Sequence, residues 1–264
     1  MLSVQRLLTY RWQVPHQAFT VTTDDGVHIV GTALAAEDTS RPALVLAHGL
    51  MGWHRRKRFA RFAEELTRWF AVYAMDLRGH GASGGLSDYG GAEISDIDAV
   101  VALAHGRGHA TVVTMGMSMG AISVIRHAAL VGNVDAVVPI SSLAWWGWRD
   151  TAHPKVAGWM DRRIVAKRGR RMLRLWGSRL PDQWTEPASP EQVVGDISPI
   201  PLLLVHGDHD ALFTLPHAEL LFELAGEPKR FLIGRGGRHA EDLIQPGFAE
   251  LLARNIFELL EQGR

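Results

Sequence analysis

A serine between two glycines is the strongest chemical signal in this sequence. Residues 116–120 are Gly-Met-Ser-Met-Gly, after a short apolar run and before a helical pattern. A strand followed by a sharp turn and a helix is the setting in which G-x-S-x-G presents a nucleophilic serine. The alternative is a loop with the same letters by chance. The context favours Ser118 as a nucleophile, with a glycine on each side where strand and helix approach closely.

Two further motifs occur in the same order as the strands. His48-Gly49 follows the apolar run 43–47, and Asp-Leu-Arg-Gly-His-Gly at 76–81 follows the run 71–75. With the serine motif, they make residues 18 to 260 resemble the α/β-hydrolase superfamily, in its serine esterase and lysophospholipase-like branch. The resemblance implies an α/β-hydrolase fold: a mostly parallel sheet with helices on both faces and a short helical lid.

The resemblance also assigns a base and an acid, because these enzymes order their triad as serine, acid and histidine. His239 ends the run Gly-Gly-Arg-His at 236–239, where Arg238 replaces the apolar or small residue that the family often has. The run 206–210, His-Gly-Asp-His-Asp, resembles the family pattern H-G-x-x-D. That pattern assigns the acid to Asp210, with Asp208 as the second candidate.

The run 206–210 also contains side chains that can bind a metal. Metal sites need three or four ligands, usually with partners distant in sequence. A complete serine triad explains the same residues, so we expect no metal and no cofactor.

The resemblance implies an oxyanion hole made of two backbone N–H groups. Met119, after the nucleophile, supplies one, and Leu50, after His48-Gly49, supplies the other. His48 is expected to hold its loop in place, and Asp76, Arg78 and His80 are also expected to be structural. For the substrate pocket we expect contacts from Met117, Trp145 and Trp146.

Alternating strand and helix patterns must position these residues. Fully apolar strands separated by helices indicate a parallel sheet covered on both faces. The turn Asp24-Asp25-Gly26 predicts an opening hairpin. Predicted strands lie at 18–23, 27–34, 43–47, 71–75, 110–115, 135–141, 201–206 and 229–234. Predicted helices lie at 55–69, 93–104, 119–131, 216–225 and 247–261.

An insertion at 143–198 interrupts this alternation and is expected to form a lid over the site. Within it, residues 149–179 hold ten basic and two acidic side chains, and the run 55–58 is Arg-Arg-Lys-Arg. A charge run of this kind is compatible with a solvated helix face. It also fits a basic rim that attracts anionic acyl substrates or associates weakly with anionic surfaces. The basic residues are Arg149, Lys155, Arg162, Arg163, Lys167, Arg168, Arg170, Arg171, Arg174 and Arg179.

Length and composition set further bounds. The 264 residues suffice for one α/β domain, 1–264, with the lid inside it. Twenty-eight basic and 28 acidic residues balance, so we expect no nucleic-acid partner. The absence of cysteine excludes disulfides, thiolate zinc sites and cysteine nucleophiles. The first residues lack the apolar core of a signal peptide, and no apolar run approaches the roughly 18 residues of a membrane span, so a soluble cytoplasmic protein is expected.

These observations predict a hydrolase of carboxylic esters that acts on a small-molecule ester or acyl substrate. A thioesterase or lysophospholipase acting on anionic acyl substrates needs the same atoms, and haloperoxidase-like or amidase chemistry also fits the site. Epoxide hydrolases and dehalogenases are disfavoured because they need aspartate in place of Ser118. Two non-enzymatic alternatives are a binding protein on the same fold and a module that docks a partner through the tryptophan-rich insertion.

Overall fold

One sheet of eight strands organises the part of the chain that the computed structural model describes, residues 9–147, 152, 154–160, 162, 166–175 and 177–263. The strand order is β1-β2-β4-β3-β5-β6-β7-β8. The pairs β1–β2 and β2–β4 are antiparallel, and the other pairs are parallel. The strands are β1 (His16–Thr22), β2 (His28–Leu34), β3 (Ala43–Ala47), β4 (Ala71–Met75), β5 (Val112–Met117), β6 (Ala136–Ile140), β7 (Leu202–Gly207) and β8 (Lys229–Gly234).

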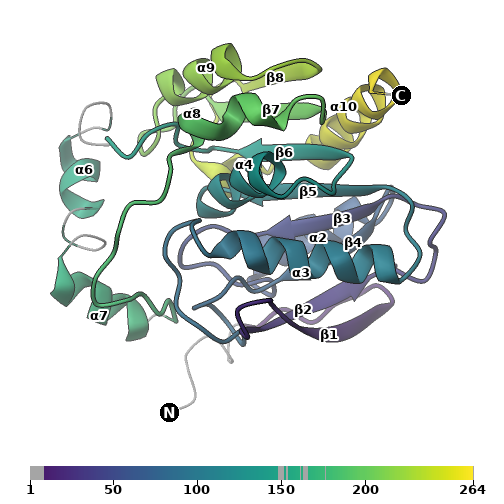
Figure 1. Ribbon diagram of the computed structural model, residues 1–264, viewed down its shortest axis with the longest axis horizontal. Helices are drawn as coiled ribbons and strands as arrows, with labels where there is room; N and C mark the ends of the chain where they lie inside the picture. The colour runs from purple at the N-terminus through teal and green to yellow at the C-terminus, as the bar shows by residue number, and fades with distance from the viewer. Residues whose placement is uncertain are drawn as a thin grey trace.

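Helices cover both faces of this sheet (Figure 1). On one face lie α3 (Glu93–Gly106), α4 (Met119–Leu130), α8 (Pro190–Val193) and α9 (Leu215–Leu224). On the other lie α2 (Lys57–Leu66) and α10 (Phe248–Gln262). The mostly parallel sheet with helices on both faces, expected from the alternating pattern, is confirmed.

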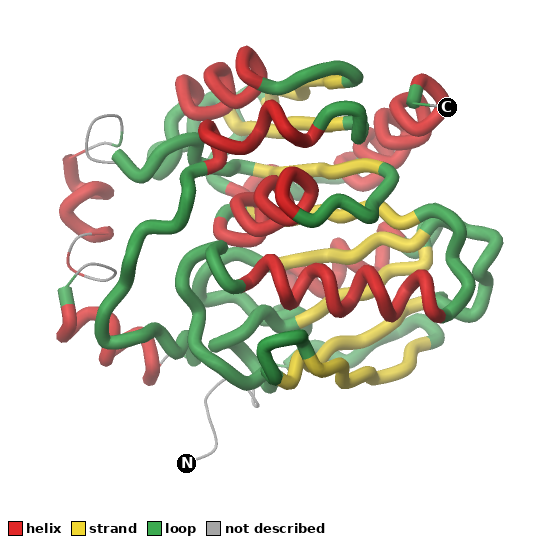
Figure 2. Tube along the Cα trace, in the orientation of Figure 1, coloured by secondary structure: helices red, strands yellow, loops and turns green. Residues whose placement is uncertain are grey.

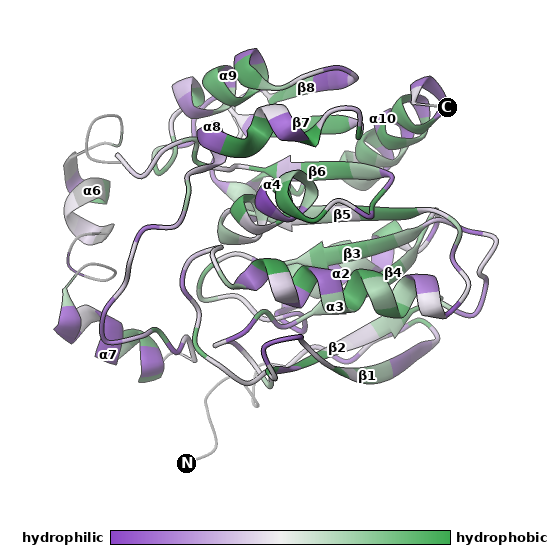
Figure 3. Ribbon diagram, viewed as in Figure 1, coloured by the Kyte–Doolittle hydropathy of each residue, from purple (hydrophilic) through white to green (hydrophobic). Residues whose placement is uncertain are grey.

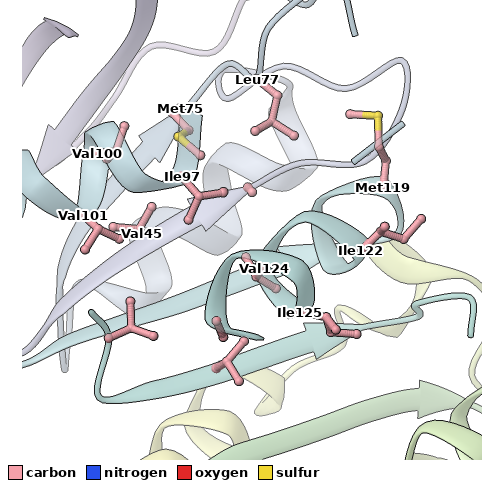
Figure 4. Close-up of a cluster of buried hydrophobic side chains, with 14 of the residues drawn as sticks. Val45, Met75, Leu77, Ile97, Val100, Val101, Met119, Ile122, Val124 and Ile125 are labelled. Atoms are coloured by element: carbon pink, nitrogen blue, oxygen red, sulfur yellow. The ribbon is translucent and has the colours of Figure 1, made fainter. Parts of the chain in front are cut away.

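Alternation along the strands divides the core into two layers. In β3, Val45 belongs to the cluster beneath α3 and α4, whereas Leu44 and Leu46 belong to the cluster beneath α2 and α10. Successive strand residues point to opposite faces, so an unbroken apolar strand supplies both layers. Figure 4 shows the first layer, in which side chains of α3 such as Ile97 and side chains of α4 such as Ile125 pack over the sheet.

The insertion between β6 and β7 extends beyond these layers. Its described residues form α6 (Pro154–Met160), α7 (Lys167–Leu175), α8 and the 3₁₀ helix η2 (Val194–Ile197). A long loop joins α7 to α8 across the edge of the molecule (Figure 2). None of the helices in the described part of the chain is long and apolar enough to cross a bilayer.

Strand boundaries differ from expectation mainly at β5, which begins two residues later than predicted and extends to Met117. Residue 111 instead offers its carbonyl to the Ala43 N–H at the start of β3, across 2.8 Å. As a result Ser118 follows the last residue of β5 directly, with α4 beginning at the next residue.

Candidate active site

Ser118 lies on a strained turn between β5 and α4. Its backbone has φ 54° and ψ −114°, which is unfavourable for a residue with a side chain and costs about 1–3 kcal/mol. The flanking glycines make the turn sterically possible. A Cβ atom on Gly116 would lie 2.1 Å from the Gly120 carbonyl oxygen, and one on Gly120 would lie 2.7 Å from the carbonyl oxygens of residues 47 and 48. The turn presents the Ser118 hydroxyl above the carboxyl ends of the parallel strands.

His239 and Asp210 meet Ser118 from two neighbouring loops. The Ser118 hydroxyl donates to Nε2 of His239 across 2.8 Å, and Nδ1 of His239 donates to Oδ2 of Asp210 across 2.7 Å. Asp210 follows β7 and His239 follows β8, and these strands are parallel neighbours. Their loops therefore leave the same edge of the sheet, which brings together three residues that are far apart in sequence.

Asp210 is held as a carboxylate by its surroundings. Its side chain is fully buried, and Oδ1 accepts the backbone N–H groups of Leu212 and Phe213 at 2.9 and 3.0 Å. Burial acts to raise the pKa of Asp210, but the hydrogen bond and charge of His239 outweigh it and lower that pKa below its ordinary value. The second candidate acid, Asp208, instead accepts the Gly236 N–H at 2.7 Å and so ties down the loop that leads to His239.

Two residues that the sequence analysis did not identify support the histidine. The ring of Phe213 meets the ring of His239 edge to face, with centroids 5.2 Å apart. The hydroxyl oxygen of Ser141 accepts the N–H of Ala240, next to His239, at 2.9 Å. The sequence gives a weak indication that Phe213 lies near the site, because Phe213 follows Asp210 by three residues and an aspartate often caps the turn that comes after it. Ser141 has no such indication, since its partner lies 99 positions away.

The two predicted oxyanion donors, Leu50 and Met119, line the same cavity as Ser118. Met119 is the first residue of α4, where an N–H has no partner within the helix. Leu50 lies inside a turn closed by the Gly52 N–H and the Gly49 carbonyl at 3.0 Å, and this turn does not use the Leu50 N–H. A Cβ atom on Gly49 would lie 3.1 Å from the Cβ of Ser118, so the loop passes close to the hydroxyl.

His48 and Asp76 hold the surrounding loops. The His48 ring donates from Nδ1 to the Gly49 carbonyl at 2.7 Å and accepts the Leu77 N–H on Nε2 at 3.1 Å. Asp76 accepts the backbone N–H and the ring Nδ1 of His54, both at 2.7 Å, and the Ala82 N–H at 2.8 Å. Burial opposes ionisation of Asp76, but His54 outweighs it and lowers the pKa of this carboxyl.

Asp76→Asn is therefore expected to destabilise the fold by about 3 kcal/mol, because an amide replaces a buried carboxylate whose partners are all donors. The lowered pKa means that the stabilisation is complete at neutral pH and declines as acid protonates the carboxyl. Urea unfolding of the two proteins at neutral pH measures the difference, and Asp24→Asn, in the exposed hairpin turn, is the control. Equal unfolding midpoints for Asp76→Asn and wild type would contradict this account.

A cavity of about 400 Å³ opens beside Ser118 and His239. Met117 and Trp146, two of the residues predicted to contact substrate, line it. Trp145 is not among the residues that line it, and its ring packs at a tilt of 34° against the ring of His217, with centroids 3.9 Å apart. Other apolar walls come from Tyr89, Ile122, Leu143, Trp159 and Trp184. The size lies within the roughly 300–1,000 Å³ of small-molecule sites, and the lining suits an apolar group.

Ion pairs at the mouth of the cavity neutralise part of the basic run 55–58. Arg56 lies 3.3 Å from Glu241, and Arg58 lies 2.8 Å from Asp242. Both acidic residues lie just beyond His239, in the 3₁₀ helix η3 (Ala240–Leu243). This run therefore adds less positive charge to the rim of the cavity than its sequence suggests.

The run 206–210 could also have been a metal site. Among the described residues, no group of three or more His, Cys, Asp or Glu side chains is arranged to hold a metal ion. His206 and Asp210 approach within 3.6 Å, but Nε2 of His206 donates to the Phe213 carbonyl at 2.7 Å. Asp208 is turned toward Gly236. The side chains of His206, Asp208 and Asp210 therefore each bond to a different partner near His239.

Comparison with known proteins agrees with this architecture. The sequence model of the alpha/beta hydrolase family matches residues 44–261. An uncharacterised protein of Escherichia coli O157:H7, YfhR, is 25% identical over 232 residues, which is 83% of this chain and 72% of that protein. An esterase of Pyrococcus furiosus superposes with a TM-score of 0.71 at 20% identity, covering 96% of this chain and 97% of the esterase. The esterase RhEst1 of Rhodococcus gives 0.69 at 18% identity, covering 92% and 99%. The chain belongs to the alpha/beta hydrolase family.

Proposed function

We propose that this protein is a serine hydrolase that cleaves carboxylic esters through an acyl-enzyme on Ser118. The observation that supports it most is the hydrogen-bonded chain Ser118–His239–Asp210, with distances of 2.8 and 2.7 Å, beside an apolar cavity. Family membership supports a hydrolase, and the solved structures with this fold include esterases. The ester linkage and the serine mechanism are the parts of the proposal that need testing.

In the proposed reaction, His239 acts as general base. Nε2 removes the Ser118 proton while Oγ attacks the ester carbonyl, and the carbonyl oxygen gains negative charge. The N–H groups of Leu50 and Met119 receive that charge. The imidazolium, stabilised by Asp210, then gives its proton to the departing alcohol. Water, activated by the same histidine, releases the acid and restores Ser118.

A fluorophosphonate probe tests this proposal directly, because it labels only an activated serine. We expect one label on the native protein, located at Ser118 by peptide mapping. Ser141 and Ser142 are internal controls, since both are fully buried and their hydroxyls bond to backbone groups. Labelling at either of them would refute the assignment, and a protein without any label would be a binding protein on this fold.

The pH profile of kcat/KM gives an independent prediction. The base must be neutral in the free enzyme, so the rate constant is expected to rise with pH and then level. Because the pKa of Asp210 is lowered, this carboxyl is already ionised at neutral pH and adds no second step there. Steady-state hydrolysis of a nitrophenyl ester across the acid-to-alkaline range measures the profile. A rate that is flat throughout would exclude a histidine base.

Substrate class is the next question, and the apolar cavity predicts a preference for an apolar acyl or aryl group. A series of nitrophenyl esters of rising acyl length, assayed beside acyl-thioesters, compares the carboxylesterase with the thioesterase. If the protein is a carboxylesterase, we expect kcat/KM to be higher for the oxygen esters than for the acyl-thioesters.

A further inference from the structure

Charge is segregated along this neutral chain. Residues 149–179 hold ten basic and two acidic side chains, whereas the rest of the chain holds eighteen basic and twenty-six acidic ones. The basic segment lies in the insertion that carries α6 and α7, at one edge of the molecule (Figure 1). The basic side chains of α6 and α7 therefore give this edge positive charge, while the rest of the sequence has an acidic excess, an arrangement that orients a protein in front of an anionic surface.

Helix α7 turns a mixed basic and apolar face toward solvent. Gly169 and Leu173 are its buried residues, four positions apart on the inner side. Exposed residues occupy the i, i+3, i+4 and i+7 positions of one outer face: Arg168, Arg171, Met172 and Leu175. Lys167 and Arg174 flank this face and are also exposed. Figure 3 shows hydrophilic residues along much of α7, interrupted by apolar ones.

The apolar side chains on this face are unusual for a solvated helix. Leu175 is 72% exposed, more than any other large apolar side chain of the described ranges, and Met172 is 39% exposed. On α6, Trp159 is 37% exposed and also lines the cavity beside Ser118. Met172 and Leu175 therefore add apolar surface to a helix face that is otherwise basic.

We propose that this surface, formed by Trp159, Met172 and Leu175 with the exposed basic side chains of α7, binds an anionic lipid bilayer. Arginine and lysine attract acidic headgroups, and the apolar side chains enter the boundary between headgroups and acyl chains. A nucleic acid would use the same positive charge but offers no apolar phase for Leu175. Trp159 also lines the cavity beside Ser118, so part of the proposed surface adjoins that cavity. Transfer of an amphiphilic ester from that bilayer to Ser118 rests on the proposed function, whereas the binding itself does not.

Vesicle flotation of the full chain tests the proposal. The vesicles are phosphatidylcholine alone or an equimolar mixture with phosphatidylglycerol. We expect the protein to float with the mixed vesicles at low salt, and the bound fraction to fall as salt screens the charges. Replacing Arg168, Arg171 and Arg174 together with Gln should lower the partition coefficient into vesicles about a hundredfold, because each arginine contributes about 1 kcal/mol to binding. Leu175→Ser should lower it about tenfold by removing apolar burial.

A matched control removes the same charge elsewhere. Arg11, Arg68 and Arg254 are exposed and lie outside the insertion, so replacing all three with Gln should leave binding unchanged. Equal loss in the two triple variants would show that only net charge matters and would overturn the proposal. So would equal binding to both kinds of vesicle, or binding of single-stranded RNA that Leu175→Ser leaves unchanged. Hydrolysis of a short soluble nitrophenyl ester should be the same in every variant, which separates failure of binding from failure of the esterase.

Discussion

Ser118→Ala is expected to lose nearly all ester hydrolysis while keeping the fold. The Ser118 hydroxyl is the one that hydrogen-bonds to His239 in the described structure, so without it the proposed acyl-enzyme cannot form. The loss in kcat should be roughly 10⁵- to 10⁶-fold, as when a serine that acts as one unit with its base is removed. The measurement is turnover of a nitrophenyl ester by the purified variant, with circular dichroism and urea unfolding as checks of the fold.

A second replacement at the same position is a useful control. The φ of 54° strains alanine as much as serine, whereas glycine adopts it freely. Ser118→Gly is therefore expected to be as inactive as Ser118→Ala but more stable, by about 1 kcal/mol. Substantial hydrolysis by both variants would remove Ser118 from the proposed mechanism.

Asp210→Asn is expected to lower kcat by about 10⁴-fold without unfolding the protein. The amide keeps the shape of the carboxylate, but it can donate toward Nδ1 of His239 and so favours the wrong tautomer of the imidazole. It also removes the charge that stabilises the imidazolium. Single-turnover kinetics with a nitrophenyl ester, where release of the phenol reports acylation, measures the loss at the step that depends on the base.

Asp208→Asn provides the matched comparison, two residues away in the same loop. The Asp208 carboxylate accepts the Gly236 N–H, and the oxygen of an asparagine side chain can accept the same hydrogen bond. We expect a change of less than about threefold, the size of a surface substitution. If Asp208→Asn proved inactive and Asp210→Asn active, the acid would be Asp208 and the assignment of Asp210 would be wrong.

The sequence predicted those features of the site that depend on local structure. The turn that carries the candidate nucleophile was predictable because a strand, a tight glycine turn and a helix lie next to one another in the chain around Ser118. Asp210 and His239 were predictable because each follows an apolar strand, and parallel strands end at one edge of a sheet. The sheet itself was predictable because apolar strands buried on both faces alternate with helices.

Features that depend on distant contacts were not predictable in the same way. Trp145 and Trp146 are neighbours in sequence, yet the ring of Trp145 packs against His217 and Trp146 lines the cavity. The basic run 55–58 gave no sign that Glu241 and Asp242 pair with two of its members. The predicted lid includes basic residues at 149 and 163, which lie outside the described residues. The role of the lid stays a prediction.

The order of the triad along the chain has a consequence for biosynthesis. Ser118 precedes His239 by 121 positions, and the loop that bears the histidine follows β8, the edge strand at one side of the sheet. On the ribosome, the serine emerges long before its base, and the centre of the sheet can assemble while β8 is still missing. A nascent or prematurely terminated chain therefore carries an inert alcohol in place of a nucleophile. If the proposed mechanism holds, hydrolysis begins only when the last strand joins, and turnover then reports complete folding.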